Sequence, residues 1–184
     1  MKIGILPLVV KEVEESILEA VKNYVEGFYS KFGFRVDLLP PTTTNDLFFS
    51  YNPIRGQFLG RFFLTKVAEH RRDFSAVLGI TDGDLYEEGM NFIFGLANPY
   101  LRAAIISLAR LRPEFYNEKD GEVLKERAIK EAMHELGHVF GLGHCENPGC
   151  VMHFSNSIID TDHKGKDYCE KCLNKLKRNL EGIG

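Results

Sequence analysis

The sequence has no excess of charge of either sign. Its 184 residues include 23 Lys and Arg and 26 Asp and Glu, and the formal net charge is -3. A protein with this balance has no overall basic field that would draw it to nucleic acid or to anionic lipid. The basic clusters HRRD, around Arg71, and KLKR, around Arg178, are short and typical of solvated helix faces. We therefore expect neither nucleic acid nor a membrane as a partner.

Long hydrophobic runs are also absent. The longest apolar stretches, such as ILPLVV near the N-terminus, fall far short of the roughly 18 residues that a membrane span needs. The opening segment MKIGILPLVV carries one lysine, and charged residues from Lys11 to Glu15 interrupt it without a small-residue cleavage site. It is typical of a first strand rather than of a signal peptide. This predicts a cytoplasmic protein.

Cysteine is missing from the first 144 residues. All four cysteines, Cys145, Cys150, Cys169 and Cys172, fall in the last 40 residues as a C-x4-C pair and a C-x2-C pair. Two such pairs separated by a loop are typical of a four-cysteine zinc site. The alternatives are two disulfides, which the missing signal peptide disfavours, and a redox role for the C-x2-C pair, which lacks its usual strand-then-helix context. A further alternative replaces one cysteine ligand by His153 or His163.

The segments that are present indicate an α/β fold. A strand-like run over residues 2–10, a helical stripe over 13–28, a short strand over 34–39 and a second helix over about 55–72 make a β-α-β-α opening. Three apolar segments follow: SAVLGIT, NFIFGLA and RAAIISLARL. Because no helix-length segment separates them, at least one neighbouring pair must be antiparallel. We expect a single domain with a mixed, twisted sheet of roughly five strands and packed helices.

Helical spacing returns after Pro113. Apolar residues from Val123 to Phe140 recur at helical spacing, Asn117 or Asp120 can cap the start, and a glycine at 141 or 143 can end the helix. The segment SNSIIDTDHKGK, residues 155–166, is then expected to be a loop before a final Lys-rich helix over about 169–180.

The segment HELGHVFGLGH, residues 134–144, carries the chemistry. His134 and His138 are four residues apart, so on a helix they lie about 40° apart around the axis and can bind one metal ion. Glu135 is rotated about 100° from His134 and is placed to hold and deprotonate a metal-bound water. Gly141 stands where a left-handed helix end needs glycine, so that the chain can turn and bring His144 to the same ion. Three nitrogen ligands with an open fourth position indicate a catalytic zinc site.

The next residue, Cys145, begins the second predicted site. Neighbouring side chains in extended backbone point to opposite sides. His144 and Cys145 are therefore expected to serve two zinc ions that lie near one another without a bridging ligand. The cysteine-bound zinc would tie the C-terminal helix to the active-site turn.

The pattern H-E-x-x-H-x-x-G-x-x-H is similar to the zinc-binding signature of the metzincin metalloproteases. Its continuation, C-x4-C-x-M followed by C-x2-C, resembles the archaemetzincins, a metzincin family with a second, cysteine-bound zinc. The matching motifs cover residues 134–172. The resemblance implies that Met152 lies in a tight Met-turn beneath the zinc without binding it, although its spacing also fits a plain core methionine.

The same resemblance implies one metzincin-type catalytic domain over residues 1–184. Residues 1–113 would form the sheet and first helices, residues 114–144 the active-site helix and turn, and residues 145–184 the Met-turn, the four-cysteine zinc site and the last helix. The catalytic zinc would be bound by His134, His138 and His144, with Glu135 as general base.

The implied activity is hydrolysis of peptide bonds in a peptide or protein substrate, as an endopeptidase or an aminopeptidase. In metzincins the substrate lies along an edge strand above the zinc, and NFIFGLA, residues 91–97, is the candidate, although its pattern fits a core strand equally well. The alternative is a zinc-binding protein with a closed or weakly active site that acts as a binding or regulatory module, for instance with Phe154 or Tyr168 over the zinc. No cysteine precedes the active-site helix, so latency by an N-terminal cysteine switch is not expected.

Overall fold

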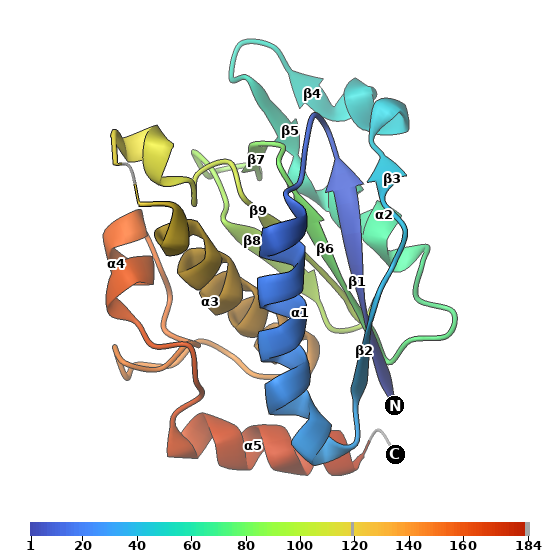
Figure 1. The fold of residues 1–184 in the computed structure, drawn as a ribbon, viewed down its shortest axis with the longest axis vertical. Helices are drawn as coiled ribbons and strands as arrows, with labels where there is room; N and C mark the ends of the chain where they lie inside the picture. Colours follow the sequence, from blue (N-terminus) through green and yellow to red (C-terminus); the bar gives the residue numbers. More distant parts are fainter. Residues whose placement is uncertain (119, 183–184) are drawn as a thin grey trace.

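A mixed β-sheet runs through the middle of the protein, which a computed structural model describes for residues 1–118 and 120–182 (Figure 1). Its strand order is β2-β1-β6-β9-β8, with the short β3 pairing with the far end of β1. All paired neighbours are parallel except β8, which is antiparallel to β9. The strands are β1 (Lys2–Val9), β2 (Arg35–Leu38), β3 (Thr42–Thr43), β6 (Ala76–Thr81), β8 (Gly95–Asn98) and β9 (Ala103–Ser107). The predicted mixed sheet, and the approximate place of its five main strands, are confirmed.

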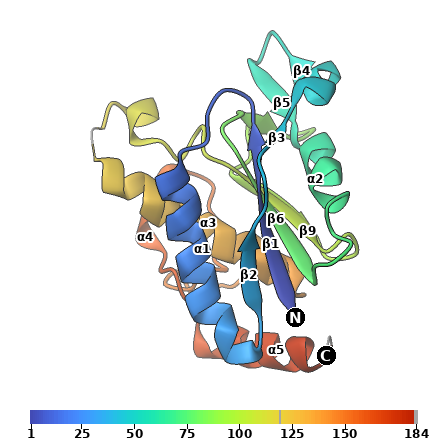
Figure 2. The same cartoon turned by 45° about the vertical axis from the view of Figure 1, so that its right-hand side comes forward.

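Helices cover both faces of this sheet (Figure 2). On one face lie α1 (Glu15–Tyr29) and α3 (Gly121–Val139), and on the other lies α2 (Gly60–Ala68). Alternate residues of β1 enter the two cores: Ile3 and Ile5 pack on the side of α1 and α3, whereas Leu6 and Leu8 pack on the side of α2. A strand that is buried on both faces needs apolar residues throughout, which explains the unbroken apolar run at the N-terminus.

The helix predicted over residues 55–72 is wrong at both ends, because α2 runs only from Gly60 to Ala68. The residues before it belong to a small second sheet made of β4 (Tyr51–Asn52), β5 (Gln57–Leu59) and β7 (Leu85–Tyr86). Gly56, with a φ of 69°, lies in the turn between β4 and β5. The chain at Arg55 therefore reverses direction instead of starting a helix.

Two other predicted strands are shorter than their apolar segments. In NFIFGLA only the part from Gly95 belongs to β8, and Ile93 forms an antiparallel bridge with Leu85 of the small sheet instead. In RAAIISLARL the strand stops at Ser107, and Leu108 and Leu111 continue as a buried turn. Short 3-10 helices fill further connections: η1 (Ser30–Phe32), η2 (Asn45–Ser50) and η3 (Pro113–Tyr116).

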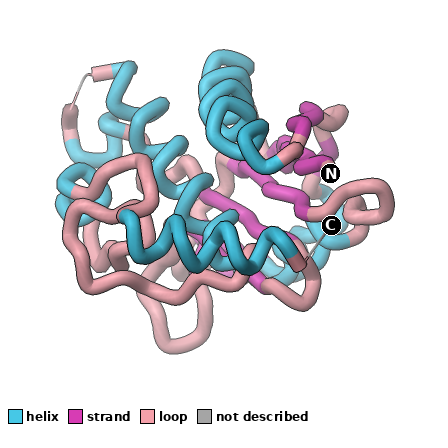
Figure 3. The backbone as a smooth tube through the Cα atoms, turned by 90° about the horizontal axis from the view of Figure 1, so that it is seen from below, coloured by secondary structure: helices cyan, strands magenta, loops and turns pink. Residues whose placement is uncertain are grey.

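The C-terminal third is more helical than predicted. Asp120 caps α3, its carboxylate accepting a hydrogen bond from the Glu122 N–H at 3.0 Å. The expected loop over residues 155–166 contains α4 (Ile158–His163), which a capping box between Ser157 and Asp160 starts. The last helix, α5 (Glu170–Glu181), lies across the lower end of the other layers (Figure 3). Within residues 1–118 and 120–182, no helix is both long enough and apolar enough to cross a membrane.

Candidate metal centres

Helix α3 brings two histidines together one turn apart. Its apolar face packs on the sheet and on α1, so the last turns of the helix are held rigidly in the core. The Nε2 atoms of His134 and His138 lie 3.0 Å apart, with His134 buried and His138 half-buried. The predicted pairing of these two histidines is present in the structure.

Both rings are fixed from behind by backbone carbonyls. The Nδ1 atom of His134 lies 2.8 Å from the Val151 oxygen, and that of His138 lies 2.8 Å from the Leu142 oxygen. A carbonyl only accepts hydrogen bonds, so each Nδ1 is the protonated nitrogen and donates. Each Nε2 therefore presents a lone pair to the space between the two rings.

The turn after α3 delivers the third histidine. Gly141 has a φ of 84°, and the N–H of Leu142 donates back to the Gly137 oxygen at 2.9 Å. This left-handed helix end turns the chain so that the ring centre of His144 lies 5.4 Å from that of His134 and 4.9 Å from that of His138. Ligand atoms of the three histidines all lie within 4.8 Å of one another.

Glu135 lies beside these histidines and packs against β8. Its side chain is buried, and burial together with the nearby charge of Glu131 raises its pKa well above the ordinary value. A Cβ placed on Gly95 would lie 2.6 Å from Oε1 of Glu135, so only glycine at that position leaves room for the carboxylate. The carboxylate therefore sits between the helix and the strand at the edge of the sheet.

Met152 is fully buried under the helix turn that separates His134 from His138. A Cβ on Gly137 would come within 2.4 Å of the Met152 sulfur, which shows how closely the sulfur approaches the helix backbone. The Met152 oxygen accepts a hydrogen bond from the Cys145 N–H at 2.9 Å. The methionine thus connects the histidine group to the start of the cysteine group.

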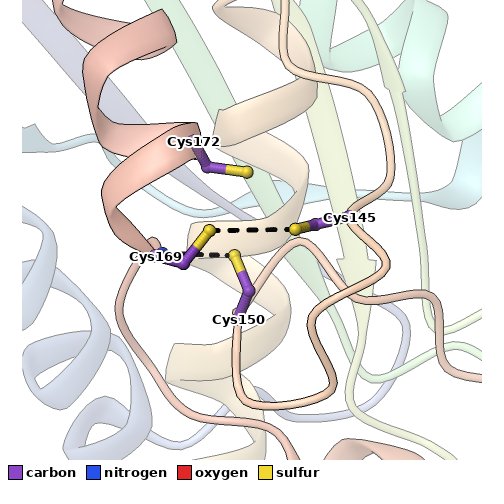
Figure 4. A group of neighbouring side chains, drawn as sticks. All are labelled: Cys145, Cys150, Cys169 and Cys172. Atoms are coloured by element: carbon purple, nitrogen blue, oxygen red, sulfur yellow. Dashed lines mark hydrogen bonds between the residues drawn. The ribbon is translucent and has the colours of Figure 1, made fainter.

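The four cysteines converge from two segments of chain (Figure 4). Cys145 and Cys150 come from the segment after the active-site turn, and Cys169 and Cys172 from the beginning of α5. The Sγ atoms of Cys145 and Cys169 lie 3.8 Å apart, and all four residues are free cysteines. Their sulfurs lie within 4.8 Å of one another, a suitable arrangement for a single ion.

The cysteine group has its own electrostatics. Cys169 occupies the N-cap position of α5, where the nearby backbone N–H of Cys172 lowers the pKa of its thiol to about 7. Burial instead raises the pKa of Cys150 and of Cys172. Only metal binding would hold all four as thiolates, because the thiolate is the form that binds zinc.

Four other side chains named from the sequence take their places outside the two groups. His153 donates from Nδ1 to the Cys145 carbonyl oxygen at 2.9 Å, and neither His153 nor His163 is a member of the cysteine group. Tyr168 is buried and hydrogen-bonds to the Met133 oxygen at 2.6 Å, so it does not lie over the histidines. The Phe154 ring is 4.9 Å from the His144 ring.

Two cavities adjoin the histidines. One, of about 480 Å³, has all three histidines and residues Gly95 to Ala97 of β8 in its wall, and the other, of about 290 Å³, is lined by His134, Glu135 and Gly95. Phe154 borders both without filling either. The site is therefore open to a ligand that lies along β8.

Sequence reasoning missed the residues that support this site from outside the motif. Gly95 lies on a different segment, and its closeness to Glu135 has no signal in the local pattern. The buried pair Glu131 and Lys164 was missed as well, although Glu131 is one helical turn before Glu135 and so lies on the same face of α3.

A helix with two histidines and a glutamate, a third histidine from the following turn, and an open cleft along a sheet edge together define a metallopeptidase domain. The model of Peptidase family M54 matches residues 6–178. An archaemetzincin of Pyrococcus abyssi is 56% identical over 172 residues, which are 92% of each chain. One of Pyrococcus horikoshii is 54% identical over 167 residues, 89% of each chain.

Solved structures agree with these sequence relatives. The crystal structure of an archaemetzincin from Methanopyrus kandleri superposes with a TM-score of 0.83 at 34% identity, covering 97% of this chain and 96% of that one. A zinc-dependent peptidase from Methanocorpusculum labreanum gives a TM-score of 0.76 at 30% identity, covering 94% and 100%. The chain therefore belongs to peptidase family M54, the archaemetzincins, and is a zinc metallopeptidase.

Proposed function

We propose that this chain hydrolyses peptide bonds with a zinc ion bound by His134, His138 and His144, and that Cys145, Cys150, Cys169 and Cys172 bind a second, structural zinc. The proposal treats residues 1–184 as one catalytic domain, and the family match over residues 6–178 supports it. Four free cysteines fit a reducing compartment, and we place the protein in the cytoplasm on that ground.

The main support for the proposal is that the Nε2 atoms of His134 and His138 direct their lone pairs toward the same point. Neither Nε2 of His134 and His138 holds a hydrogen when both Nδ1 atoms donate to carbonyls, so no hydrogen bond joins them across their 3.0 Å separation. Burial lowers the pKa of both rings, so a protonated ring that donates a hydrogen bond to the other is disfavoured as the explanation for the short distance. Two nitrogens bound to one tetrahedral zinc lie about 3.3 Å apart, so a zinc ion suits the pair.

A zinc ion held by the three histidines would supply Lewis-acid chemistry: it would lower the pKa of water towards about 7 and would polarise a substrate carbonyl. Glu135 accepts the proton of the attacking water and then delivers it to the leaving amine. Burial and the raised pKa of its carboxyl suit this exchange, because a base with a pKa closer to neutral can release the proton that it has taken. Gly95 keeps the space that the carboxylate needs.

The substrate would lie extended along β8. This strand ends the sheet order, so within the described residues no strand of the main sheet pairs with its outer edge. An exposed edge offers backbone N–H and C=O groups to a peptide, which adds to the sheet as a further strand. Because Gly95, Leu96 and Ala97 line the cavity beside the histidines, this edge would hold the peptide over the zinc.

Met152 would act as the Met-turn residue, supporting the histidine pair without binding zinc. Its sulfur lies against Gly137, the residue that precedes His138 on the helix, and its backbone oxygen accepts a hydrogen bond from the Cys145 N–H. The purely regulatory alternative is not favoured, because the two cavities leave the histidines accessible.

Cleavage of a mixed peptide library tests the proposal. The zinc-loaded wild type is expected to cleave part of the library, and Glu135→Ala is expected to leave it intact while keeping its zinc. Glu126→Ala, an exposed glutamate on the same helix, is the matched control and should cleave like the wild type. Failure of the zinc-loaded wild type to cleave any peptide would contradict the proposed activity.

A further inference from the structure

A buried ion pair that the proposed mechanism does not use lies next to the active site. Lys164, which follows α4, is completely buried, and its Nζ atom is 2.9 Å from Oε1 of Glu131, whose side chain is 4% exposed. Glu131 lies one turn before Glu135 on the same face of α3. Burial of two charges costs free energy of folding unless they have further hydrogen-bond partners. This pair therefore suggests a role other than stabilising the fold.

The hydrogen-bonding capacity around this pair is only partly used. Oε1 of Glu131 also accepts from Thr161 Oγ1 at 3.3 Å, but within residues 1–118 and 120–182 no hydrogen bond reaches its Oε2 atom. Among the same residues, the buried Oγ of Ser155 has no hydrogen-bond partner, and Nζ of Lys164 has none apart from its ion pair with Glu131. Buried polar groups are normally paired, so Oε2 of Glu131 and Oγ of Ser155 remain available to hydrogen-bond a polar ligand.

Two of these residues face a cavity. Glu131 and Ser155 line the cavity of about 290 Å³ that also borders His134 and Glu135. The remaining wall is largely apolar and includes Phe92 and Phe94. The cavity therefore combines an apolar wall with a carboxylate acceptor and a hydroxyl, directly beside the atoms that would carry out hydrolysis.

We propose that this cavity is a specificity pocket for a neutral carboxamide side chain, glutamine above all, on the substrate residue next to the cleaved bond. This inference rests on the proposed peptidase function. The amide N–H would donate to Glu131 and the amide oxygen would accept from Ser155, while the methylenes would lie against the apolar wall.

Other side chains fit this pocket less well. An aliphatic side chain would leave Glu131 and Ser155 without partners, which costs affinity in a desolvated site. An acidic side chain would meet the Glu131 carboxylate. A cationic one would meet a carboxylate whose charge the buried Lys164 already balances, so it would gain little from an ion pair there.

Matched peptides test the preference. A cleaved peptide is varied at each of the two positions that flank the bond, with glutamine, methionine, glutamate or lysine, which are similar in length and differ in polarity and charge. At one of the two positions the wild type is expected to cleave the glutamine peptide at least about tenfold faster in kcat/KM than the methionine peptide, since a lost hydrogen bond in a desolvated site costs a factor of this order. Equal or faster cleavage of the methionine or lysine peptide at both positions would overturn the inference.

Variants of the pocket residues test whether the preference for glutamine arises in this cavity. Ser155→Ala, and the double variant Glu131→Leu with Lys164→Met, should bring the glutamine-to-methionine ratio close to one; the double change removes both charges together and so leaves no uncompensated ion. The control is Glu126→Leu with Lys166→Met, an exposed pair 3.0 Å apart that involves the same helix and lies outside the pocket, and it should keep the ratio. An unchanged ratio in both pocket variants would contradict the assignment.

Binding separates this inference from the proposed activity. Zinc-loaded Glu135→Ala is titrated with the glutamine and the methionine peptides by calorimetry, where no turnover is needed. Tighter binding of the glutamine peptide, again by at least about tenfold, supports the pocket even if the wild type cleaves neither peptide. Equal affinities, or no binding of either peptide, would count against it.

Discussion

The histidine group and the cysteine group meet at consecutive residues, yet they are built differently. The histidine group has three members, and His144 is exposed beside an open cavity. The cysteine group has four, with Cys150 and Cys172 buried. A three-ligand site with an open side suits chemistry, whereas four ligands close the coordination sphere and leave the metal a structural task.

The two groups also differ in what they connect. Both histidines of α3 are anchored to carbonyls of the segment that follows the helix, so that group depends on the correct position of residues 142–152. The cysteine group joins this same segment to α5. The comparison teaches that the second site can determine the geometry of the first without sharing a ligand with it.

The largest effect is expected from the cysteine group. Cys169→Ser with Cys172→Ser should remove one of the two proposed zinc ions and lower the free energy of unfolding by more than about 5 kcal/mol, because binding of a structural zinc is folding free energy. His144→Ala should weaken the other zinc with a much smaller loss of stability. Zinc analysis and denaturant unfolding of both variants measure this contrast, and a greater loss of stability in His144→Ala would reverse it.

The next effect concerns activity alone. Glu135→Gln should lower kcat by about 10² to 10⁴, the usual contribution of a general base, while both zinc ions remain bound. Peptide cleavage together with zinc analysis measures it. Retention of full activity would remove Glu135 from the proposed mechanism.

The histidines and Glu135 should give the free energy of unfolding opposite dependences on pH. A mild chelator is expected to remove the histidine-bound zinc first, because that ion has only three protein ligands. In this one-zinc form the pKa values of His134 and His138 are lowered by burial from 6.5, so the unfolded chain binds protons more readily and stability falls as pH drops below about 6.5.

Glu135 acts in the opposite sense. Its pKa is raised by burial from 4.5, so the folded protein holds the proton more tightly and stability falls as pH rises through and above about 4.5. Glu135→Gln should therefore be more stable than the wild type at neutral pH, and the gap should close below pH 4.5. Unfolding of both one-zinc forms over a pH series provides the measurement, and a gap that does not vary with pH would contradict the assignment.

The smallest effect should come from the active-site turn. Gly141→Ala should cost about 1–2 kcal/mol, because φ is 84° there, and should weaken zinc binding by His144. Gly143→Ala is the matched control: no atom lies within 4 Å of its added Cβ, and the change in stability should stay within about 0.5 kcal/mol. Equal effects of the two substitutions on zinc affinity would show that the left-handed turn is not needed.

Most of the main sheet could be predicted because burial on both faces imposes long apolar runs, as in β1 and β6. The small sheet could not, since strands of two or three residues such as β4 and β7 are too short for any periodicity. Helix α4 was missed although its signal, Ser157 followed by Asp160 in a capping box, is in the sequence. Its polar residues suggested a loop instead.

In the site, the three histidines could be predicted as one group because they lie within eleven residues of sequence. The residues that complete the site come from distant segments: Gly95 against Glu135, and Lys164 against Glu131. Such contacts depend on how α3, β8 and the segment after α4 pack together. A single sequence carries no record of that packing.

The count of zinc ions per folded chain tests the comparison of the two groups most directly. Native mass spectrometry of the protein purified under reducing conditions should show two zinc ions per chain. The Cys169→Ser, Cys172→Ser variant should show one. A single zinc in the intact protein, with its four cysteines joined in two disulfides, would contradict the account.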